Sequence, residues 1–304
     1  MLTVSNYHYI REDFKTKYPS IFGVTPLAFK KQLLLLQNQG EFIASKDLLD
    51  NSEQILSSKE NYILITFDDG LKEQVDFGFS ILNELNIPAM FFANSINYQE
   101  KKISTVHKIH LLRSKIESEI ILKRIENKYK SKLQTIDVAK IKAIYIYDDE
   151  KSAVLKYILN FVLDYKEQEE VINELFSNHF NENEVLNDLY MTTNNLQELA
   201  NLGYLGSHTH SHYPLGLLPL KDITKELESS KNYFESLTKT KIDTVAYPYG
   251  TDEACTAEVS KLATLAGYKF GFTTKRGVNL NPQDKLLLNR FDCNDVIGGK
   301  NYKI

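Results

Sequence analysis

A short apolar segment that ends abruptly in two carboxylates constrains this chain more than any other feature. Residues 62–67, which read Tyr-Ile-Leu-Ile-Thr-Phe, are rich in β-branched and aromatic side chains, and Asp68, Asp69 and Gly70 follow directly. This composition predicts a buried strand that stops at the aspartates. Adjacent side chains leave a strand in different directions, so one carboxylate can bind a metal while its neighbour handles a proton. Taken alone, the pair is more typical of a turn or a helix cap.

Strand and helix signals alternate along the chain, which predicts a mainly parallel α/β fold. Thr25 and Pro26 are typical of a helix start, and the apolar spacing after them continues to Gly40. The remaining elements are predicted by their apolar spacing: helices over residues 71–86, 196–201, 220–237 and 253–266, and strands over residues 89–93, 244–247 and 268–273.

The rhythm changes between about residues 98 and 190, where long charged segments carry helix-like apolar spacing. We interpret this region as a helical insertion within a single domain that spans residues 1–304. Such an insertion can overhang a cleft, shape substrate choice or mediate the formation of an oligomer. His107 and His110 lie three residues apart within it, and amphipathic surface positions explain them better than a second metal site.

A second polar segment, residues 206–212, reads Gly-Ser-His-Thr-His-Ser-His. His208 and His212 are four residues apart, and imidazoles at this spacing can converge on one ion. Two neutral imidazoles and one carboxylate form a three-ligand set for a catalytic Zn²⁺ that leaves a position for water and substrate. The histidine pair alone is as typical of an ordinary segment as of a metal site. Together with the two aspartates it favours a hydrolytic metal centre, from which we leave His210 out because it lies between the two ligands.

These segments resemble the polysaccharide deacetylase family, the NodB-homology or family 4 carbohydrate esterase group. Residues 66–70 match its first motif at every position, and residues 208–212 match its His-Ser/Thr-x-x-His motif. Residues 247–250, which read Tyr-Pro-Tyr-Gly, resemble its third motif. The order and separation of the motifs also agree. The resemblance implies a distorted (β/α)₇ barrel with its site at the C-terminal ends of the strands.

The resemblance also implies a role for each matching residue. Asp69, His208 and His212 become the metal ligands, and Asp68 becomes the general base that takes a proton from a metal-bound water. That water attacks an acetamide carbonyl, and the backbone N–H of Tyr249 helps to hold the resulting oxyanion. Zn²⁺ is the expected metal for this ligand set, although Co²⁺, Ni²⁺, Fe²⁺ or Mn²⁺ can bind the same residues.

The sequence departs from the family pattern in two places. The Leu-x-His motif expected near the C-terminus is absent, so no histidine there can act as the general acid. His8 lies in a Tyr-His segment that resembles the N-terminus of circularly permuted members, such as exopolysaccharide N-deacetylases, and is our candidate acid. Ala246 stands where the third motif usually has an arginine that orients the base. Arg290 is the nearest replacement by motif order, although a purely structural arginine is an equally good interpretation.

Composition fits an enzyme domain and argues against several other classes. The chain has 304 residues, of which 42% are hydrophobic and 25% charged, so a large core is available. A net charge of -4 supplies no basic stripe for a phosphate backbone, and we expect no nucleic-acid partner. The first residues lack a signal-peptide pattern, and no apolar run approaches the length of a membrane span, which predicts a cytoplasmic protein.

We therefore expect a metal-dependent N-deacetylase. Its substrate would be an acetylated amino sugar, free, nucleotide-linked or lipid-linked, that serves as a cytosolic precursor in surface-glycan biosynthesis. An O-deacetylase is chemically close. The alternative class is a sugar-binding or scaffolding protein that keeps the metal but has lost turnover, which Ala246 and the missing C-terminal histidine would permit. His8 separates these classes, because an acid placed across the cleft from Asp68 favours an enzyme and a remote or buried His8 favours a binder.

Overall fold

The computed structural model describes residues 1–19, 23–134, 136–144 and 148–302. The chain divides into two compact units. The first consists of Met1–Phe14, Phe22–Lys102 and Leu186–Ile304, and the second of Lys15–Ile21 and Ile103–Val185. The interpretation of residues 98–190 as an insertion into one domain stays a prediction.

The first unit is built on a parallel sheet whose strands follow the order β7-β6-β5-β4-β3-β1-β8, with β2 paired to β3 beside this path. Every pairing between the named strands is parallel, so the strands end at the same edge. The curled parallel sheet with its helices confirms the predicted distorted (β/α) barrel. The strands are β1 Leu2–Tyr7, β2 Glu41–Phe42, β3 Tyr62–Phe67, β4 Ala89–Ala93, β5 Leu205–Ser207, β6 Thr244–Ala246, β7 Phe270–Phe272 and β8 Phe291–Asp292.

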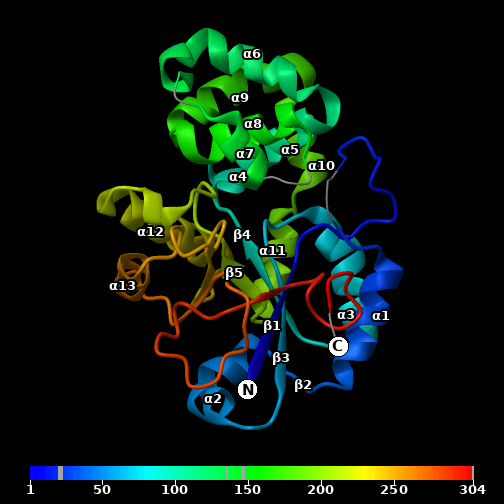
Figure 1. Ribbon diagram of the computed structural model, residues 1–304. Coiled ribbons are helices and arrows are strands. Elements are labelled where there is room, and N and C mark those ends of the chain that lie inside the picture. The colour runs from blue at the N-terminus through cyan, green and yellow to red at the C-terminus, as the bar shows by residue number, and fades with distance from the viewer. Residues whose placement is uncertain (20–22, 135, 145–147, 303–304) are drawn as a thin grey trace. The chain divides into compact units, whose positions relative to one another are not determined.

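The segment that follows β7 joins the two ends of the strand order. Leu288 forms a parallel bridge with Phe272 of β7, and Phe291 of β8 pairs with Ser5 of β1. In Figure 1 this closing segment is the red part of the chain, and β1 beside it is blue. Arg290 lies between these two contacts, so closure of the sheet brings its side chain to the edge where the strands end.

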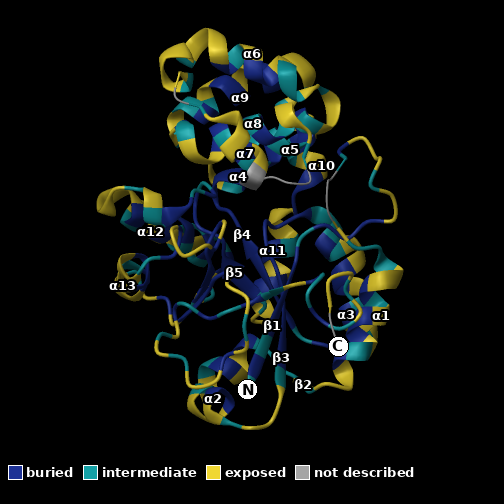
Figure 2. Cartoon of the chain, viewed as in Figure 1, coloured by how far each residue is buried: buried dark blue, intermediate teal, exposed yellow. Residues whose placement is uncertain are grey.

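Aromatic side chains fill the space between the central strands and the helix before β2. The rings of Phe67 and Phe91, on neighbouring strands, are stacked with centroids 4.6 Å apart. Tyr7 and Phe29 meet edge to face at 4.9 Å. Figure 2 shows most of the central strands, such as β4 and β5, in dark blue and the exposed residues mainly on the outer faces of the helices. This packing fixes the strands firmly, and therefore the positions of the residues that follow them.

Helices surround the strands of the first unit, as Figure 1 shows. The predicted helix start at Thr25 is confirmed, because its side chain accepts the N–H of Ala28 at 3.2 Å and Pro26 is the first helical residue. The helical elements of this unit are α1 Pro26–Gln37, α2 Ser45–Ser57, the π-helix η1 Gln74–Phe79, α3 Ser80–Leu85, α4 Ile96–Gln99, α11 Thr193–Asn201, the 3₁₀ turn η4 Leu215–Leu217, α12 Leu220–Thr238 and α13 Ala257–Leu265.

Two predicted helices begin later than the apolar spacing indicated. The helix predicted from residue 253 begins at Ala257, because the Thr256 side chain accepts the N–H of Val259 and caps it there. The helix predicted from residue 71 begins after a turn at Leu71 and opens as η1. Apolar periodicity located both helices, whereas local capping and turn bonds set their first residues.

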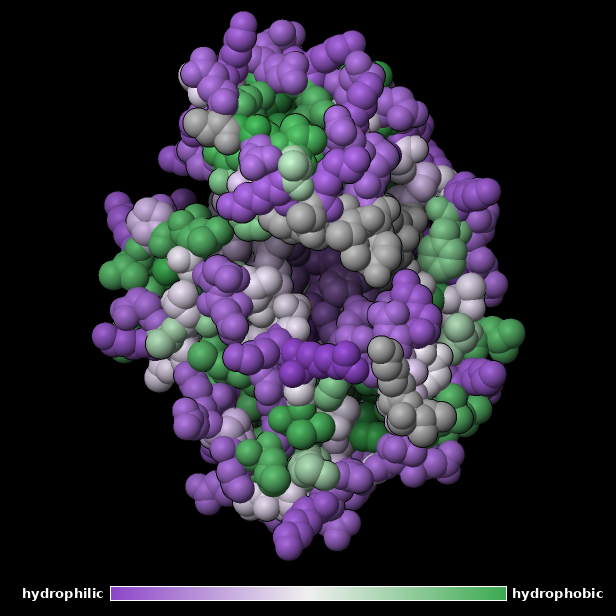
Figure 3. Space-filling model, viewed as in Figure 1, coloured by the Kyte–Doolittle hydropathy of each residue, from purple (hydrophilic) through white to green (hydrophobic). Residues whose placement is uncertain are grey.

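The second unit is helical, and its helices are drawn mainly in green in Figure 1. Lysine and arginine side chains of α6 and η2 pair with glutamates of α9, as in Arg124 with Glu174 and Lys132 with Glu167. Figure 3 shows hydrophilic residues gathered over α6. His107 is buried at 1% exposure, so the expected surface position was wrong for it. The elements are α5 Thr105–Lys115, α6 Ser118–Tyr129, η2 Lys130–Leu133, α7 Val138–Ile144, α8 Glu150–Tyr157, η3 Ile158–Val162, α9 Tyr165–His179 and α10 Glu182–Leu189, the last of which runs into the first unit.

Among the residues that the structure describes, no helix is both long enough and apolar enough to cross a membrane.

Replacing Gly206 of β5 with alanine should destabilise the first unit. A Cβ atom there would lie 2.5 Å from Cδ1 of Phe92 and 2.8 Å from Oγ1 of Thr244, inside the packed sheet. Overpacking of this kind costs about 1–3 kcal/mol of unfolding free energy, which urea unfolding of Gly206→Ala would measure. Gly277→Ala is the control, because its nearest neighbour is the movable amide end of Asn289. An equal loss in both variants would contradict the explanation.

Candidate metal centre

The candidate site lies where four parallel strands end. His8 follows β1, Asp68 follows β3, His208 follows β5, and the Tyr-Pro-Tyr-Gly segment that contains Tyr249 follows β6. Tyr7 of β1 is the register partner of Phe67 of β3, which sets His8 beside Asp68. This edge is where parallel α/β folds place their ligands and catalytic groups.

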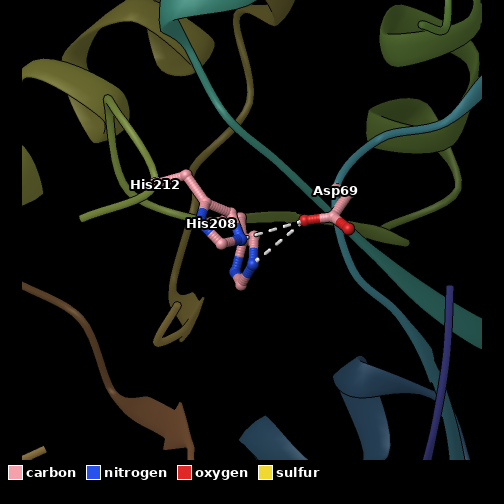
Figure 4. Close-up of side chains that lie close together, drawn as sticks. All are labelled: Asp69, His208 and His212. Atoms are coloured by element: carbon pink, nitrogen blue, oxygen red, sulfur yellow. Dashed lines mark ion pairs between the residues drawn. The ribbon is translucent and has the colours of Figure 1, made fainter. Parts of the chain in front are cut away.

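Three buried side chains converge at this edge. Oδ1 of Asp69 lies 3.4 Å from Nε2 of His208 and 3.2 Å from Nε2 of His212, and Figure 4 shows both imidazoles facing the carboxylate. The three side chains form a group whose ligand atoms all lie within 4.8 Å of one another, and it is the only such group of His, Cys, Asp or Glu side chains among the described residues. Their exposures are 5%, 2% and 9%.

The spacing of these three atoms fits a metal ion. Ligand atoms bound to Zn²⁺ at about 2.0–2.2 Å in a tetrahedral arrangement lie about 3.3–3.6 Å apart, close to the separations found here. Burial lowers the pKa of His208, but the carboxylates of Asp68 and Asp69 raise it more, and the net shift is upward. The electrostatic environment therefore favours a positive charge at this point.

The backbone is strained at four residues around this group. Asp69 has a φ of 79°, and Thr209, His212 and Tyr249 each have a φ of 63°. Non-glycine residues in such conformations cost about 1–3 kcal/mol each and persist only where the surrounding structure holds them. Their concentration in the three loops that meet here is typical of a functional site.

Asp68 is held by several donors, although it is buried. Arg290 donates from Nη1 to Oδ1 at 2.8 Å and from Nη2 to Oδ2 at 2.7 Å, and Asn6 donates its amide N–H to Oδ2 at 2.9 Å. Burial raises the pKa of Asp68, but the charges of Arg290, His208 and His8 and the Arg290 hydrogen bonds outweigh that effect and lower the pKa to about 2. The carboxylate therefore stays ionised at neutral pH.

Arg290 is fixed as firmly as the carboxylate that it binds. Its side chain is 1% exposed, and its Nε donates to the carbonyl of Thr273 at 2.8 Å. Ala246, at the position of the usual motif arginine, lies buried in β6 and leaves no charge there. Its carbonyl accepts the Nδ1–H of His208 at 2.8 Å, which directs Nε2 of that ring toward Asp69.

His8 lies at the open side of this arrangement. Its Nε2 is 4.0 Å from Oδ2 of Asp68, and its side chain is 40% exposed. The side chain of Gln74 ties the two strand ends together, because its amide donates to the carbonyls of His8 at 2.9 Å and Asp68 at 2.5 Å. His8 is therefore neither remote from the carboxylate nor buried.

Tyr249 is held through its backbone. Its carbonyl accepts the hydroxyl of Thr274 at 2.7 Å, and the next carbonyl, of Gly250, accepts the N–H of Thr274 at 2.9 Å. The ring centroid of Tyr249 lies 5.4 Å from that of His212. The loop that carries Tyr249 thus lies against the candidate metal ligands Asp69, His208 and His212.

Two residues that bind or position Asp68 were missed in the sequence. Asn6 is 4% exposed in β1, and Gln74 is fully buried at the start of η1. The signal for Asn6 was available, because a polar side chain in a buried strand needs a partner. Gln74 gave no comparable signal, since it lies in a segment predicted as a helix, where a polar side chain needs no special partner.

Comparisons with known proteins match part of the sequence and the overall fold. A family model described as polysaccharide deacetylase matches residues 142–271, which include the histidine and Tyr-Pro-Tyr-Gly motifs but not the aspartates. A search of curated proteins gave no match.

Several solved structures have a similar fold. The deacetylase PplD of Streptococcus pyogenes has a TM-score of 0.58 at 16% identity, over 96% of this chain and 91% of that chain. IcaB of Ammonifex degensii has a TM-score of 0.55 at 18% identity, over 95% and 90% of the two chains. A de-N-acetylase from Aggregatibacter actinomycetemcomitans has a TM-score of 0.56 at 14% identity, over 95% and 94%.

The fold and the site define a parallel β/α barrel with a buried His/Asp centre at its strand ends. The family model adds the matching sequence pattern over residues 142–271. The predicted resemblance to the polysaccharide deacetylase family is thereby confirmed.

Replacing Arg290 with glutamine should strongly destabilise the protein. The variant leaves the Asp68 carboxylate buried without its guanidinium, and breaking a buried pair in this way costs about 3–5 kcal/mol. Denaturant unfolding of Arg290→Gln and of the double variant Asp68→Asn/Arg290→Gln would measure this cost. The double variant should lose less than Arg290→Gln alone, because no charge is left unpaired.

Arg276→Gln is the matched control for that measurement. Arg276 is 60% exposed and lies 3.8 Å from Asp295. An exposed pair contributes about 0–1 kcal/mol. If Arg290→Gln costs no more than Arg276→Gln, the buried ion pair does not stabilise the fold in the way described.

Proposed function

We propose that this protein is a metal-dependent N-deacetylase that hydrolyses the acetamide group of an amino sugar. The observation that carries the proposal is the buried group Asp69, His208 and His212 beside a second carboxylate, Asp68, whose two oxygens are held by Arg290. The match of residues 142–271 to the polysaccharide deacetylase model supports hydrolysis of an acetylated sugar. The similar S. pyogenes deacetylase is described in complex with acetate, which is the product of such a reaction.

In this proposal Asp69, His208 and His212 hold one divalent metal. When bound, that metal supplies Lewis acidity, which lowers the pKa of a water and polarises an acetyl carbonyl. Two imidazoles and one carboxylate favour Zn²⁺, and Co²⁺, Ni²⁺, Fe²⁺ or Mn²⁺ suit the same donors.

Asp68 acts as the general base. Its pKa of about 2 keeps it ionised, and it accepts a proton only from a strongly acidified donor. Arg290 and Asn6 hold the carboxylate in one orientation, so it need not reorganise as the proton arrives. The depressed pKa of this base therefore suits a site that also acidifies its water.

His8 acts as the general acid, and the Tyr249 N–H as an oxyanion donor. The exposed imidazole of His8 can reach a substrate and still lies beside Asp68. As the C–N bond breaks, His8 donates a proton to the departing sugar amine. Asp68 then releases the proton taken from water, and His8 regains a proton from solvent before the next turnover. The products are acetate and a free amino sugar. The hydrogen bonds between Thr274 and the carbonyls of Tyr249 and Gly250 support a preorganised backbone donor.

The alternative of an inactive sugar-binding protein rested on Ala246 and the missing C-terminal histidine. The geometry favours an enzyme, because Arg290 binds the carboxylate of Asp68, the proposed base, and His8 lies beside the same carboxylate. An O-deacetylase would use the same groups and is distinguished by the substrates below. The cytoplasmic location, the role in glycan biosynthesis and an oligomer formed through the helical segments stay predictions.

The acid–base assignment predicts large losses of activity. Acetate release would be measured on N-acetylated sugars, nucleotide sugars, short glycans and O-acetylated esters with the Zn²⁺-loaded protein. Asp68→Asn and His8→Ala should each lower kcat by roughly 10²–10⁴-fold, the usual contribution of a positioned acid or base. His179→Ala, at an exposed position of the second unit, should retain full activity.

Three outcomes would contradict parts of this assignment. Full activity in His8→Ala would exclude His8 as the acid and leave the metal hydrolase intact. Activity on esters alone would favour the O-deacetylase. Release of acetate from no acetylated compound, by a wild type that binds metal, would favour the binding protein.

Removal of the metal should also be visible in stability. Zn²⁺ at about 100 times its dissociation constant should add about 2.7 kcal/mol to the unfolding free energy, because it binds the folded state. Thermal unfolding with Zn²⁺ or with a chelator would show this difference in wild type. Asp69→Ala should lose most of the stabilisation by Zn²⁺. If Zn²⁺ stabilises this variant as much as it stabilises wild type, Asp69 is not a ligand.

A further inference from the structure

The two candidate ligand histidines belong to one short segment, residues 208–212, which we call the histidine loop. The loop carries two residues in the left-handed conformation, Thr209 and His212. This conformation is rare for a β-branched residue such as Thr209. The loop therefore needs partners that hold it, and those partners contribute no ligand atom.

His210 provides the first set of contacts. It lies between the two ligands and is 7% exposed. Its Nδ1 is 2.7 Å from Oγ of Ser95, and its Nε2 is 3.0 Å from Oε1 of Glu100. Both partners belong to the segment that follows β4, and Glu100 is itself paired with Lys102 at 2.8 Å.

The backbone of the same segment binds the loop directly. The N–H of Ser95 donates to the carbonyl of Thr209 at 3.3 Å, and the N–H of Ile96 donates to the carbonyl of His210 at 3.1 Å. The Asn94 amide donates to the carbonyl of His208. Three successive residues after β4 thus bind three successive carbonyls of the loop.

Glu226 binds the histidine loop from an element that follows it in sequence. It lies in α12, is 7% exposed, and its Oε2 accepts the N–H of Ser211 at 2.7 Å. A hydrogen bond from a backbone N–H to a carboxylate is stronger than one between neutral groups. The contact fixes the peptide immediately before His212.

His210 and Glu226 are costly to bury, because apolar side chains in their places would lose no hydration. A buried carboxylate or imidazole loses hydration, and only its hydrogen bonds offset that loss. Here the bonds go to the loop that places two imidazoles near Asp69, and fixed outer partners are what orient metal ligands in proteins. We propose that His210 and Glu226 are positioning residues that hold the histidine loop in its metal-binding conformation before the metal arrives. This inference rests on the proposed metal centre.

The test is the affinity of the full-length protein for Zn²⁺, measured by competition with a chromogenic chelator and requiring no turnover. His210→Ala and Glu226→Ala should each weaken Zn²⁺ binding about 10–100-fold, the usual effect of removing an outer partner of a ligand. Glu226→Gln keeps an acceptor for the Ser211 N–H and should bind within a few-fold of wild type. Glu228→Ala, exposed on the same helix, is the matched control and should bind as wild type does.

Hydrogen exchange of the metal-free protein supplies a second measurement. In Glu226→Ala the amide of Ser211 should exchange faster, while the strands of the core keep their protection. This result shows a loosened loop in a folded protein. It also keeps the test informative if His210→Ala does not fold.

The outcomes separate this inference from the proposed function. Zn²⁺ affinity equal to wild type in both alanine variants would overturn the positioning role, even if their thermal midpoints fall, since a merely structural role predicts that pattern. If wild type binds none of Zn²⁺, Co²⁺, Ni²⁺, Fe²⁺ and Mn²⁺, both the proposed metal centre and this inference are overturned. Weakened binding in the variants, with a wild type that binds metal but releases no acetate, would support the inference and contradict the N-deacetylase.

Discussion

The buried ion pair between Asp68 and Arg290 is the interaction on which the rest of the site depends. A carboxylate at 2% exposure is tolerated only because two guanidinium nitrogens and the Asn6 amide satisfy both of its oxygens. Arg290 reaches it because the segment between β7 and β8 closes the sheet and holds the guanidinium against Thr273. The pair therefore connects the architecture of the barrel to the protonation state of one carboxylate.

The candidate metal ligands Asp69, His208 and His212 depend on a different constraint, the conformation of the backbone that carries them. Asp69 and His212 both lie in the left-handed region, and in this conformation Oδ1 of Asp69 is 3.2 Å from Nε2 of His212. The folded protein supplies the energy for this strain through loops that are hydrogen-bonded to the ends of neighbouring strands. The result is a group with its donors already converged, which lowers the entropic cost of binding an ion.

Local sequence patterns predicted the parallel α/β fold, and the family resemblance selected Asp69, His208 and His212 as the residues that converge. The strand before Asp68, the cap at Thr25 and the histidine spacing are all readable within a few residues. The contact between Arg290 and Asp68 was a guess from motif order, since no local signal links positions so far apart. The part played by Gln74 and the left-handed backbone at Thr209 were out of reach, because they arise only when loops from separate strands pack together. The late starts of η1 and α13 show the same limit on a smaller scale, since a turn at Leu71 precedes the first and the Thr256 cap sets the second.

The sequence distance across the closing segment has a consequence for how the protein folds. Asp68 and Arg290 are 222 residues apart, whereas His8 and Asp68 come from strands that pair early in the chain. Contacts between distant residues form late, because the entropy of closing a long loop must be overcome first. A partly folded chain with β1, β3 and β4 paired would still have Asp68 in water, with an ordinary affinity for protons. We expect the base to acquire its depressed proton affinity only in the last step of assembly, when β8 docks on β1.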